Sequence, residues 1–244
     1  MNILKYKTMR KLVLTLLMLL TLSLSAQDKE VVKFMGIPVD GSKSEMISQL
    51  KKKGFSYNRE YDYLEGRFNG ENAQVFVHTN NDVVDRIMVT FENPVSETDI
   101  KIKFNNLVRQ FNNNEKYFSE YEDQVIGDNV DISYEMSVNS KRFEAGFHQC
   151  HTKNEIEDLK QNLYDNYDLI MENVANSPES KELGISLDRD KEENINLLVA
   201  MYTFGFLMKN DVWFMISESA IRYNYYNINL FYDNQYNRPN GEDL

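Results

Sequence analysis

The stretch KFMGIPVDGSKSEMISQLKKKGF, from Lys33 to Phe55, carries the signals of a short strand, a tight turn, a helix and a helix end. Ser42 is the expected N-cap, because Glu45 follows three residues later and completes a capping box. Three apolar residues then recur at helical spacing: Met46, Ile47 and Leu50. Gly54 can end the helix in a left-handed conformation, with Phe55 folding back as its hydrophobic contact. This stretch therefore predicts a strand–turn–helix unit at the start of the fold.

The glycines of this stretch do not form a phosphate-binding loop. Gly36 and Gly41 show neither the dinucleotide-binding nor the Walker spacing. Asp40 and Gly41 are instead typical of a turn, because aspartate bonds to its own backbone and glycine adopts positive φ at little cost. The stretch predicts architecture and no catalytic chemistry.

A strand over Tyr61–Phe68, a hairpin and a second helix are expected after this unit. Gln74–Thr79 and Val83–Phe91 form a predicted hairpin with one buried face, because apolar residues alternate along the second strand. Ser96 is a helix cap, and the apolar stripe that follows it ends at Phe111. The first half thus reads β-α-β-β-β-α, with a helix across one face of an antiparallel sheet.

The second half mixes the same elements. Asp131–Val138 and Lys141–His148 alternate in polarity and predict another hairpin. From Asn154 to Ala175 the apolar residues step by three and four, which predicts one helix. Ile195–Met208 is apolar nearly all round but too short to span a membrane, so a buried helix is expected. Two further strands are predicted: Val212–Ser217 and Tyr225–Tyr232.

Together these elements predict an α+β fold in which helices pack on one face of an antiparallel sheet. Residues 27–244 are long enough for one domain or two small ones. Because both parts combine helices with hairpins, we also consider two related halves, 27–126 and 127–244.

The N-terminus has the pattern of a signal peptide over residues 1–26. Four basic residues precede an apolar core from Leu12 to Leu24, and Ala26 is the small residue expected before a cut at Gln27. The apolar core has about 13 residues, whereas a membrane-spanning helix needs about 20. We expect an exported protein, periplasmic or secreted, with no stable membrane insertion after cleavage.

The net charge of the chain disfavours nucleic acids as partners. The formal net charge is −11, and removal of the four basic residues of the signal peptide changes it to −15. An acidic surface repels phosphate backbones and anionic lipids, so we expect no nucleic acid partner.

Cys150 is the only cysteine, which excludes an intramolecular disulfide. It lies in His148-Gln149-Cys150-His151, the only cluster of metal-ligand residue types. A closed zinc site needs four ligands, and His78 lies on a distant segment, so we assign no metal site and no cofactor. Ordinary packing at a strand end explains the cluster.

Aromatic residues crowd the C-terminal part of the chain. Tyrosine and tryptophan at a wet surface are natural contact residues, although alternate members of such a run can equally fill the core. The candidate binding residues are Trp213, Tyr223, Tyr225, Tyr226, Tyr232 and Tyr236.

Three segments together resemble a family of exported proteins from Bacteroidetes-type gut bacteria. They are FMGIPVDGSKSEMISQLKKKGF at 34–55, the hairpin through Val83–Phe91, and YDNQYNRPNGEDL at 232–244. The family has no known activity, so the resemblance implies export and supplies no catalytic residues. The helix-plus-hairpin plan is also similar, in architecture, to β-lactamase-inhibitor-like envelope modules. Fold does not imply function.

No motif with a catalytic mechanism is present, and we assign no catalytic residue. The sequence favours a non-catalytic exported protein that binds a protein or small ligand of the cell envelope. The alternative is an envelope hydrolase whose site combines dispersed acids with the His148–His151 region. A third hypothesis is metal transport or storage. A deep pocket where His148 or His151 meets carboxylates would favour the hydrolase, and a shallow aromatic face would favour the binding protein.

Overall fold

The computed structural model describes residues 30–121, 123–176 and 190–239. The predicted signal peptide, its cleavage site and most of the polar connection at 177–191 lie outside the described residues. The chain divides into two compact units. Unit 1 comprises Met1–Glu30 and Cys150–Met208, and unit 2 comprises Val31–Gln149 and Lys209–Leu244.

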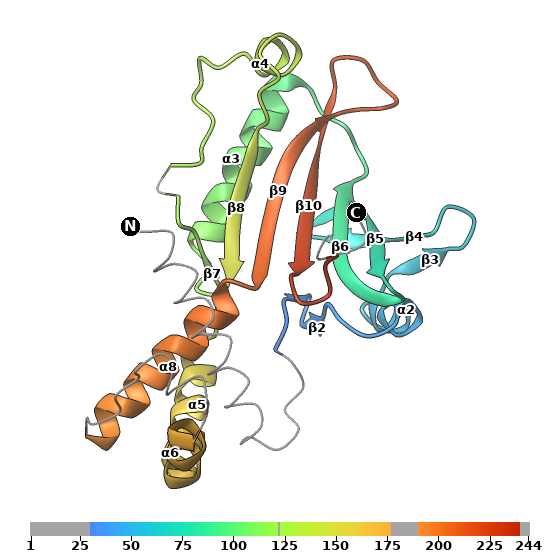
Figure 1. Cartoon of the computed structure of the whole chain (residues 1–244). Helices are drawn as coiled ribbons and strands as arrows, with labels where there is room; N and C mark the ends of the chain where they lie inside the picture. The colour runs from blue at the N-terminus through green and yellow to red at the C-terminus, as the bar shows by residue number, and fades with distance from the viewer. Residues whose placement is uncertain (1–29, 122, 177–189, 240–244) are drawn as a thin grey trace. The chain divides into compact units, whose positions relative to one another are not determined.

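Unit 2 contains an eight-stranded antiparallel sheet (Figure 1). Its strands, in spatial order, are β3 (Ser56–Asn58), β4 (Tyr63–Phe68), β5 (Glu71–Asn80), β6 (Val83–Phe91), β10 (Tyr226–Asn234), β9 (Asn210–Glu218), β8 (Glu144–Gln149) and β7 (Tyr117–Phe118). Two short strands, β1 (Lys33–Phe34) and β2 (Ile37–Pro38), form a separate hairpin. The predicted α+β class with an antiparallel sheet is confirmed.

The predicted first helix is α2 (Lys43–Lys52), and its ends are built as expected. Ser42 and Glu45 form the capping box. Gly54 has a φ of 96°, and the Phe55 N–H donates to the Leu50 carbonyl at 3.2 Å. These bonds satisfy carbonyl groups that a helix end otherwise leaves unpaired.

Two helices cover one face of the sheet. α3 (Glu97–Asn112) begins at its predicted cap Ser96 and lies along β8 and β9 in Figure 1. Met46 and Leu50 of α2 and Phe104 of α3 belong to one continuous core with the buried strand residues. At the centre of that core, Phe214 packs edge-on against Phe104, with ring centroids 5.0 Å apart. We call this side of the sheet the covered face.

The strand order has an internal symmetry. α2 is followed by β3, β4, β5 and β6 in spatial order, and α3 is followed along the chain by β7, β8, β9 and β10, whose spatial order is reversed. The two series meet where β6 pairs with β10. The second segment of unit 1, Cys150–Met208, lies between β8 and β9 in the chain. The division into halves at residues 126 and 127 stays a prediction.

One predicted hairpin is wrong. Residues 131–138 form no strand but the helix α4 (Ile132–Ser137), and β8 pairs with β7 and β9. Asp131 caps this helix by accepting from the Tyr134 N–H at 2.8 Å. Ile132 is buried and Met136 packs against the core, whereas Tyr134 and Val138 are exposed. The apolar residues four apart form the buried side, so the apparent alternation misled the interpretation.

Unit 1 is helical in its described part. The predicted helix from Asn154 to Ala175 is divided at Asn166 into α5 (Lys153–Asp165) and α6 (Tyr167–Asn176). α8 (Lys191–Leu207) corresponds to the predicted buried helix. Its burial is incomplete, since Phe204 is exposed. A small core joins these helices and consists of Leu163, Ile170, Ile195, Leu198 and Val199. Among the described residues, no helix is long and apolar enough to cross a membrane.

Candidate binding surface

The side chains that alternate with the core residues point to the other side of the sheet, which we call the open face. Strand register aligns five of its positions in one line across β5, β6, β10, β9 and β8. We call this line the apolar row. Its members are Phe76, Met88, Phe231, Trp213 and Gly146. Tyr63 extends it at one end, because its ring centroid lies 5.5 Å from that of Phe76.

Trp213 and Phe231 form the rigid centre of the apolar row. Their rings stack with centroids 4.1 Å apart and planes 17° apart. The Arg86 guanidinium lies 5.1 Å from the Phe231 centroid and 5.8 Å from that of Trp213. A cation at this distance is attracted to the electron-rich ring face. Phe231 is only 7% exposed, whereas Trp213 and Arg86 are half-buried, so the arrangement presents part of the indole together with a positive charge.

Asp233 holds this centre in place. Its carboxylate accepts from Arg86 Nε at 2.5 Å and from Trp213 Nε1 at 2.7 Å, and it also pairs with Arg238. Asp233 is fully buried, so its charge needs these partners. The pairing with Asp233 raises the pKa of Arg86. The indole and both guanidinium groups are thereby fixed in orientation.

Polar residues border the apolar row on both sides. One border aligns His78, Arg86, Asp233, Asp211 and His148. The other aligns the polar residues Gln74, Thr90, Asn229 and Glu144, with the apolar Met215 between the last two. Within the second border, Thr90 Oγ1 donates to Asn229 Oδ1 at 2.8 Å, and Asn229 Nδ2 donates to Ser217 Oγ at 3.0 Å. An apolar centre with a polar rim is the usual anatomy of a protein interface.

The six aromatic residues predicted from the sequence do not form one surface. Tyr226 and Tyr232 lie in the core, and burial raises the pKa of Tyr232 well above its ordinary value. Trp213 lies on the open face. Tyr223 is 89% exposed between β9 and β10. Tyr225 and Tyr236 each carry a cation over the ring, Arg222 and Lys209 respectively.

The open face includes residues that the sequence did not single out as binding residues, such as Phe76, Met88, Arg86 and Asp233. Their alternation with core residues was visible in each strand. Their proximity was not, because β6 and β10 lie far apart in the chain and Arg86 and Asp233 are separated by 147 positions. Strand order was the missing information.

The two histidines of the His148–His151 segment belong to different units. In unit 2, His148 Nδ1 lies 3.0 Å from Asp211 Oδ1. In unit 1, His151 Nε2 lies 2.5 Å from Glu30 Oε2, which also accepts from the Tyr202 hydroxyl at 2.8 Å. Desolvation raises the pKa of the Cys150 thiol, which disfavours a reactive thiolate. Among the described residues, no group of three or more metal-ligand side chains is close enough to hold an ion.

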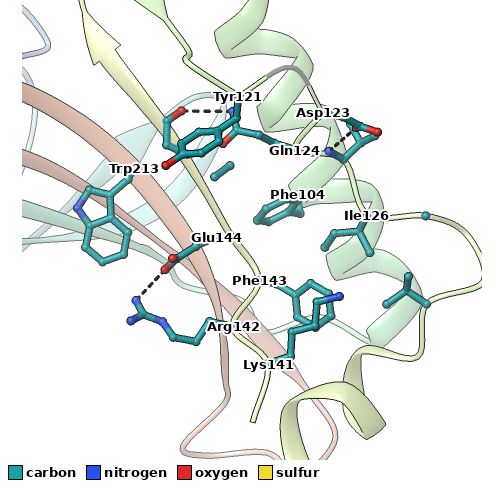
Figure 2. A pocket seen from close by; sticks show the side chains of 15 residues that line it. Phe104, Tyr121, Asp123, Gln124, Ile126, Lys141, Arg142, Phe143, Glu144 and Trp213 are labelled. Carbon is teal, nitrogen blue, oxygen red and sulfur yellow. Dashed lines mark hydrogen bonds and ion pairs between the residues drawn. The ribbon is translucent and has the colours of Figure 1, made fainter. Parts of the chain in front are cut away.

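A cavity of about 690 Å³ opens beside β8 in unit 2 (Figure 2). Phe104, Ile126 and Phe143 lie together on one side of β8, and Trp213 lies on the other. Asp123 and Glu144 contribute acids, and Lys141 and Arg142 contribute bases. The described lining contains no histidine, serine or cysteine. The pocket in which a histidine meets carboxylates, expected for a hydrolase, is therefore not this one.

No protein-family model matches the chain, and no curated protein or solved structure is significantly similar to it. The resemblance to exported Bacteroidetes-type proteins and to inhibitor-like envelope modules stays a prediction.

Proposed function

We propose that the protein is a non-catalytic exported binding protein, periplasmic or secreted, that binds a partner protein through the open face. The apolar row carries this proposal. It crosses five strands, a distance of about 19 Å at a strand spacing of about 4.8 Å. Both helices of unit 2 that pack along the sheet, α2 and α3, lie on the covered face.

The composition of the open face favours a protein over a small ligand. Tryptophan, phenylalanine, methionine and arginine are enriched at the centres of protein interfaces. The row is part of a broad sheet surface, whereas a small ligand needs a concave site that encloses most of it. Arg86 and Trp213 are held by Asp233 before any partner arrives, so little side-chain entropy is lost on binding.

Affinity capture with matched variants tests the proposal. The mature protein, residues 27–244, is immobilised and exposed to cell-envelope fractions. Met88→Glu places a charge within the apolar row, beside Phe231, and Ile102→Glu places the same charge on an exposed position of α3. We expect partners that bind the wild type and Ile102→Glu but bind Met88→Glu at least about 30-fold more weakly, because burying an unpaired charge costs about 2 kcal/mol or more.

Trp213 supplies an independent readout. It is the only tryptophan, so a partner that covers the open face changes the fluorescence of a single known residue. Tyr223→Glu reports separately on the exposed aromatic between β9 and β10. Retention of the same partners by Met88→Glu, or no enrichment on the wild type, would overturn the proposal.

A further inference from the structure

β8 pairs with β9 on one side, and on its other side, which we call the outer edge, it is paired along only part of its length. β7 contributes two residues, with Tyr117 opposite Gln149 and Phe118 opposite His148. Among the described residues, no strand pairs with β8 on this side beyond His148. The chain after β7 instead passes along the far side of the cavity, where Tyr121 and residues 123–127 line it. A strand edge that ends in a cavity needs another source of hydrogen bonds.

At Gly146 a side chain takes the place of the missing strand. Gln124 Oε1 accepts from the Gly146 N–H at 2.6 Å, and Gln124 Nε2 donates to the Gly146 carbonyl at 3.2 Å. Ser119 Oγ donates to the same carbonyl at 3.1 Å. The primary amide reproduces the donor and acceptor of a peptide group. At Gly146 the outer edge of β8 is therefore bonded to an amide group, as it would be to the backbone of a neighbouring strand.

Glu144 is the next position with the same orientation. In an antiparallel ladder, residues that bond to one neighbour alternate with residues that face the opposite side. The Ile216 N–H donates to the Phe143 carbonyl, which places Phe143 among the residues that bond toward β9. Glu144, like Gly146, then directs its N–H and carbonyl away from β9. Glu144 lines the cavity, so its backbone groups open into it.

The walls of the cavity suit an extended backbone. Its floor is apolar because Phe104, Ile126 and Phe143 are buried core residues. Tyr121 stands on the open-face side, where a Cβ added to Gly146 would meet its ring at 3.9 Å. The charged lining residues are two acids and two bases, and Arg142 pairs with Glu144 at 2.8 Å. A balanced lining of this kind favours a neutral main chain over a strongly charged ligand.

We propose that an extended peptide segment of a partner protein binds in this cavity as an added strand beside β8. Its main chain forms two hydrogen bonds with Glu144. The peptide residue opposite Glu144 points to the open-face side, toward Tyr121 and Trp213. The residues before and after it point to the apolar floor, so the preferred sequence has apolar residues on both sides of a central position. This peptide site is independent of the proposed function, because it uses the edge of β8 and not the apolar row.

Peptide selection followed by a backbone variant tests this inference. The probe is a library of random seven-residue peptides displayed on phage and selected on the full mature protein. Glu144→Pro removes the outward N–H without removing a bond to β9, a position where an edge strand tolerates proline. Glu144→Ala is the control, because it removes the side chain and keeps the N–H. We expect peptides with the apolar–x–apolar pattern that bind Glu144→Pro at least about tenfold more weakly than Glu144→Ala.

A second experiment, with modified peptides, tests the inference even if the Glu144→Pro variant does not fold. Synthetic peptides selected on the wild type are N-methylated at one position at a time. One methyl group that removes the donor to the Glu144 carbonyl should weaken binding about tenfold, and methyl groups at the adjacent positions should not. Equal tolerance at every position, or no selected peptide, would overturn the inference.

Met88→Glu separates the two proposals. Peptides that bind Glu144→Pro normally and are lost on Met88→Glu occupy the open face, which overturns the edge site and supports the proposed function. Peptides lost on Glu144→Pro and retained on Met88→Glu support the edge site whatever the open face binds.

Discussion

The two faces of the sheet are made by the same strands but differ in the interactions that hold their side chains. In β9, Phe214 is fully buried on the covered face, and its neighbour Met215 is half-buried on the open face. The covered face gains its stability from apolar burial, whereas on the open face Trp213 and Arg86 are held by a hydrogen bond and an ion pair to Asp233. The difference teaches that one residue of a strand can stabilise the core while the next belongs to the proposed binding surface. Substitutions on the open face can therefore probe binding while the fold is retained.

The largest expected effect comes from a core truncation. Phe214→Ala should reduce the free energy of unfolding by about 3–5 kcal/mol, because the ring packs against Phe104, Phe111 and Phe147 and its loss leaves a cavity. The neighbouring Met215→Ala should cost less than about 1 kcal/mol. Urea unfolding of the two variants measures the contrast. Similar costs for both would show that the open face is as tightly packed as the covered face.

Asp233 is the most buried member of the apolar row and its borders, with no exposed surface. Asp233→Ala should cost about 2–3 kcal/mol, because it leaves Arg86 and Arg238 without their acceptor. The value lies below that of a fully buried pair because both arginines are about one-third exposed. The same variant should change the fluorescence of Trp213, which loses its hydrogen bond. A neutral result in urea unfolding would mean that water replaces the carboxylate.

Alanine substitutions at two glycines compare the packing of the two faces by adding one carbon atom to each. A Cβ at Gly66 would lie 2.4 Å from Phe55 Cδ1, whereas a Cβ at Gly146 would meet Tyr121 only at 3.9 Å. Gly66→Ala should therefore destabilise the fold by about 1–3 kcal/mol through overcrowding. Gly146→Ala should change stability by less than about 1 kcal/mol. Thermal unfolding of the pair provides the measurement, and equal shifts would contradict the assigned packing.

Local signals were sufficient for much of this fold. The capping box of α2, its terminal Gly54 and the cap of α3 act between residues a few positions apart, so the sequence displays them directly. The region 131–138 failed because its spacing fits both a strand and a helix. Its cap, Asp131, was the better indication, since an aspartate bonded to the N–H three residues later starts a helix.

The candidate surface could not be predicted to the same degree. Each strand showed which residues alternate with the core, but the apolar row exists only because β6 lies beside β10. The aromatic cluster of the C-terminal region included Trp213, which lies half-buried on the open face. It also included Tyr226 and Tyr232, which alternation placed in the core. Side-chain type alone does not show whether an aromatic residue lies in the core or on the open face.

The smallest expected effect concerns a carboxylate with the same type of partners as Asp233 but without its burial. Asp62 accepts from Lys43 Nζ at 2.6 Å and from the Tyr57 hydroxyl at 2.7 Å, and its side chain is about half exposed. The hydrogen bond from Lys43, followed by that from Tyr57, lowers the pKa of Asp62. A lowered folded-state pKa contributes stability above the unfolded-state pKa of about 3.9, and the contribution is lost as the pH falls through the folded-state value.

Asp62→Asn should accordingly cost less than about 1 kcal/mol at pH 7, because solvent screens an exposed ion pair. The difference between variant and wild type should shrink as the pH falls below about 4, and 1 M salt should reduce it at pH 7. Urea unfolding at several pH values measures both trends. A cost as large as that of Asp233→Ala would show that burial does not decide the strength of these ion pairs, because the two carboxylates share cationic and neutral donors and differ mainly in their exposure to water.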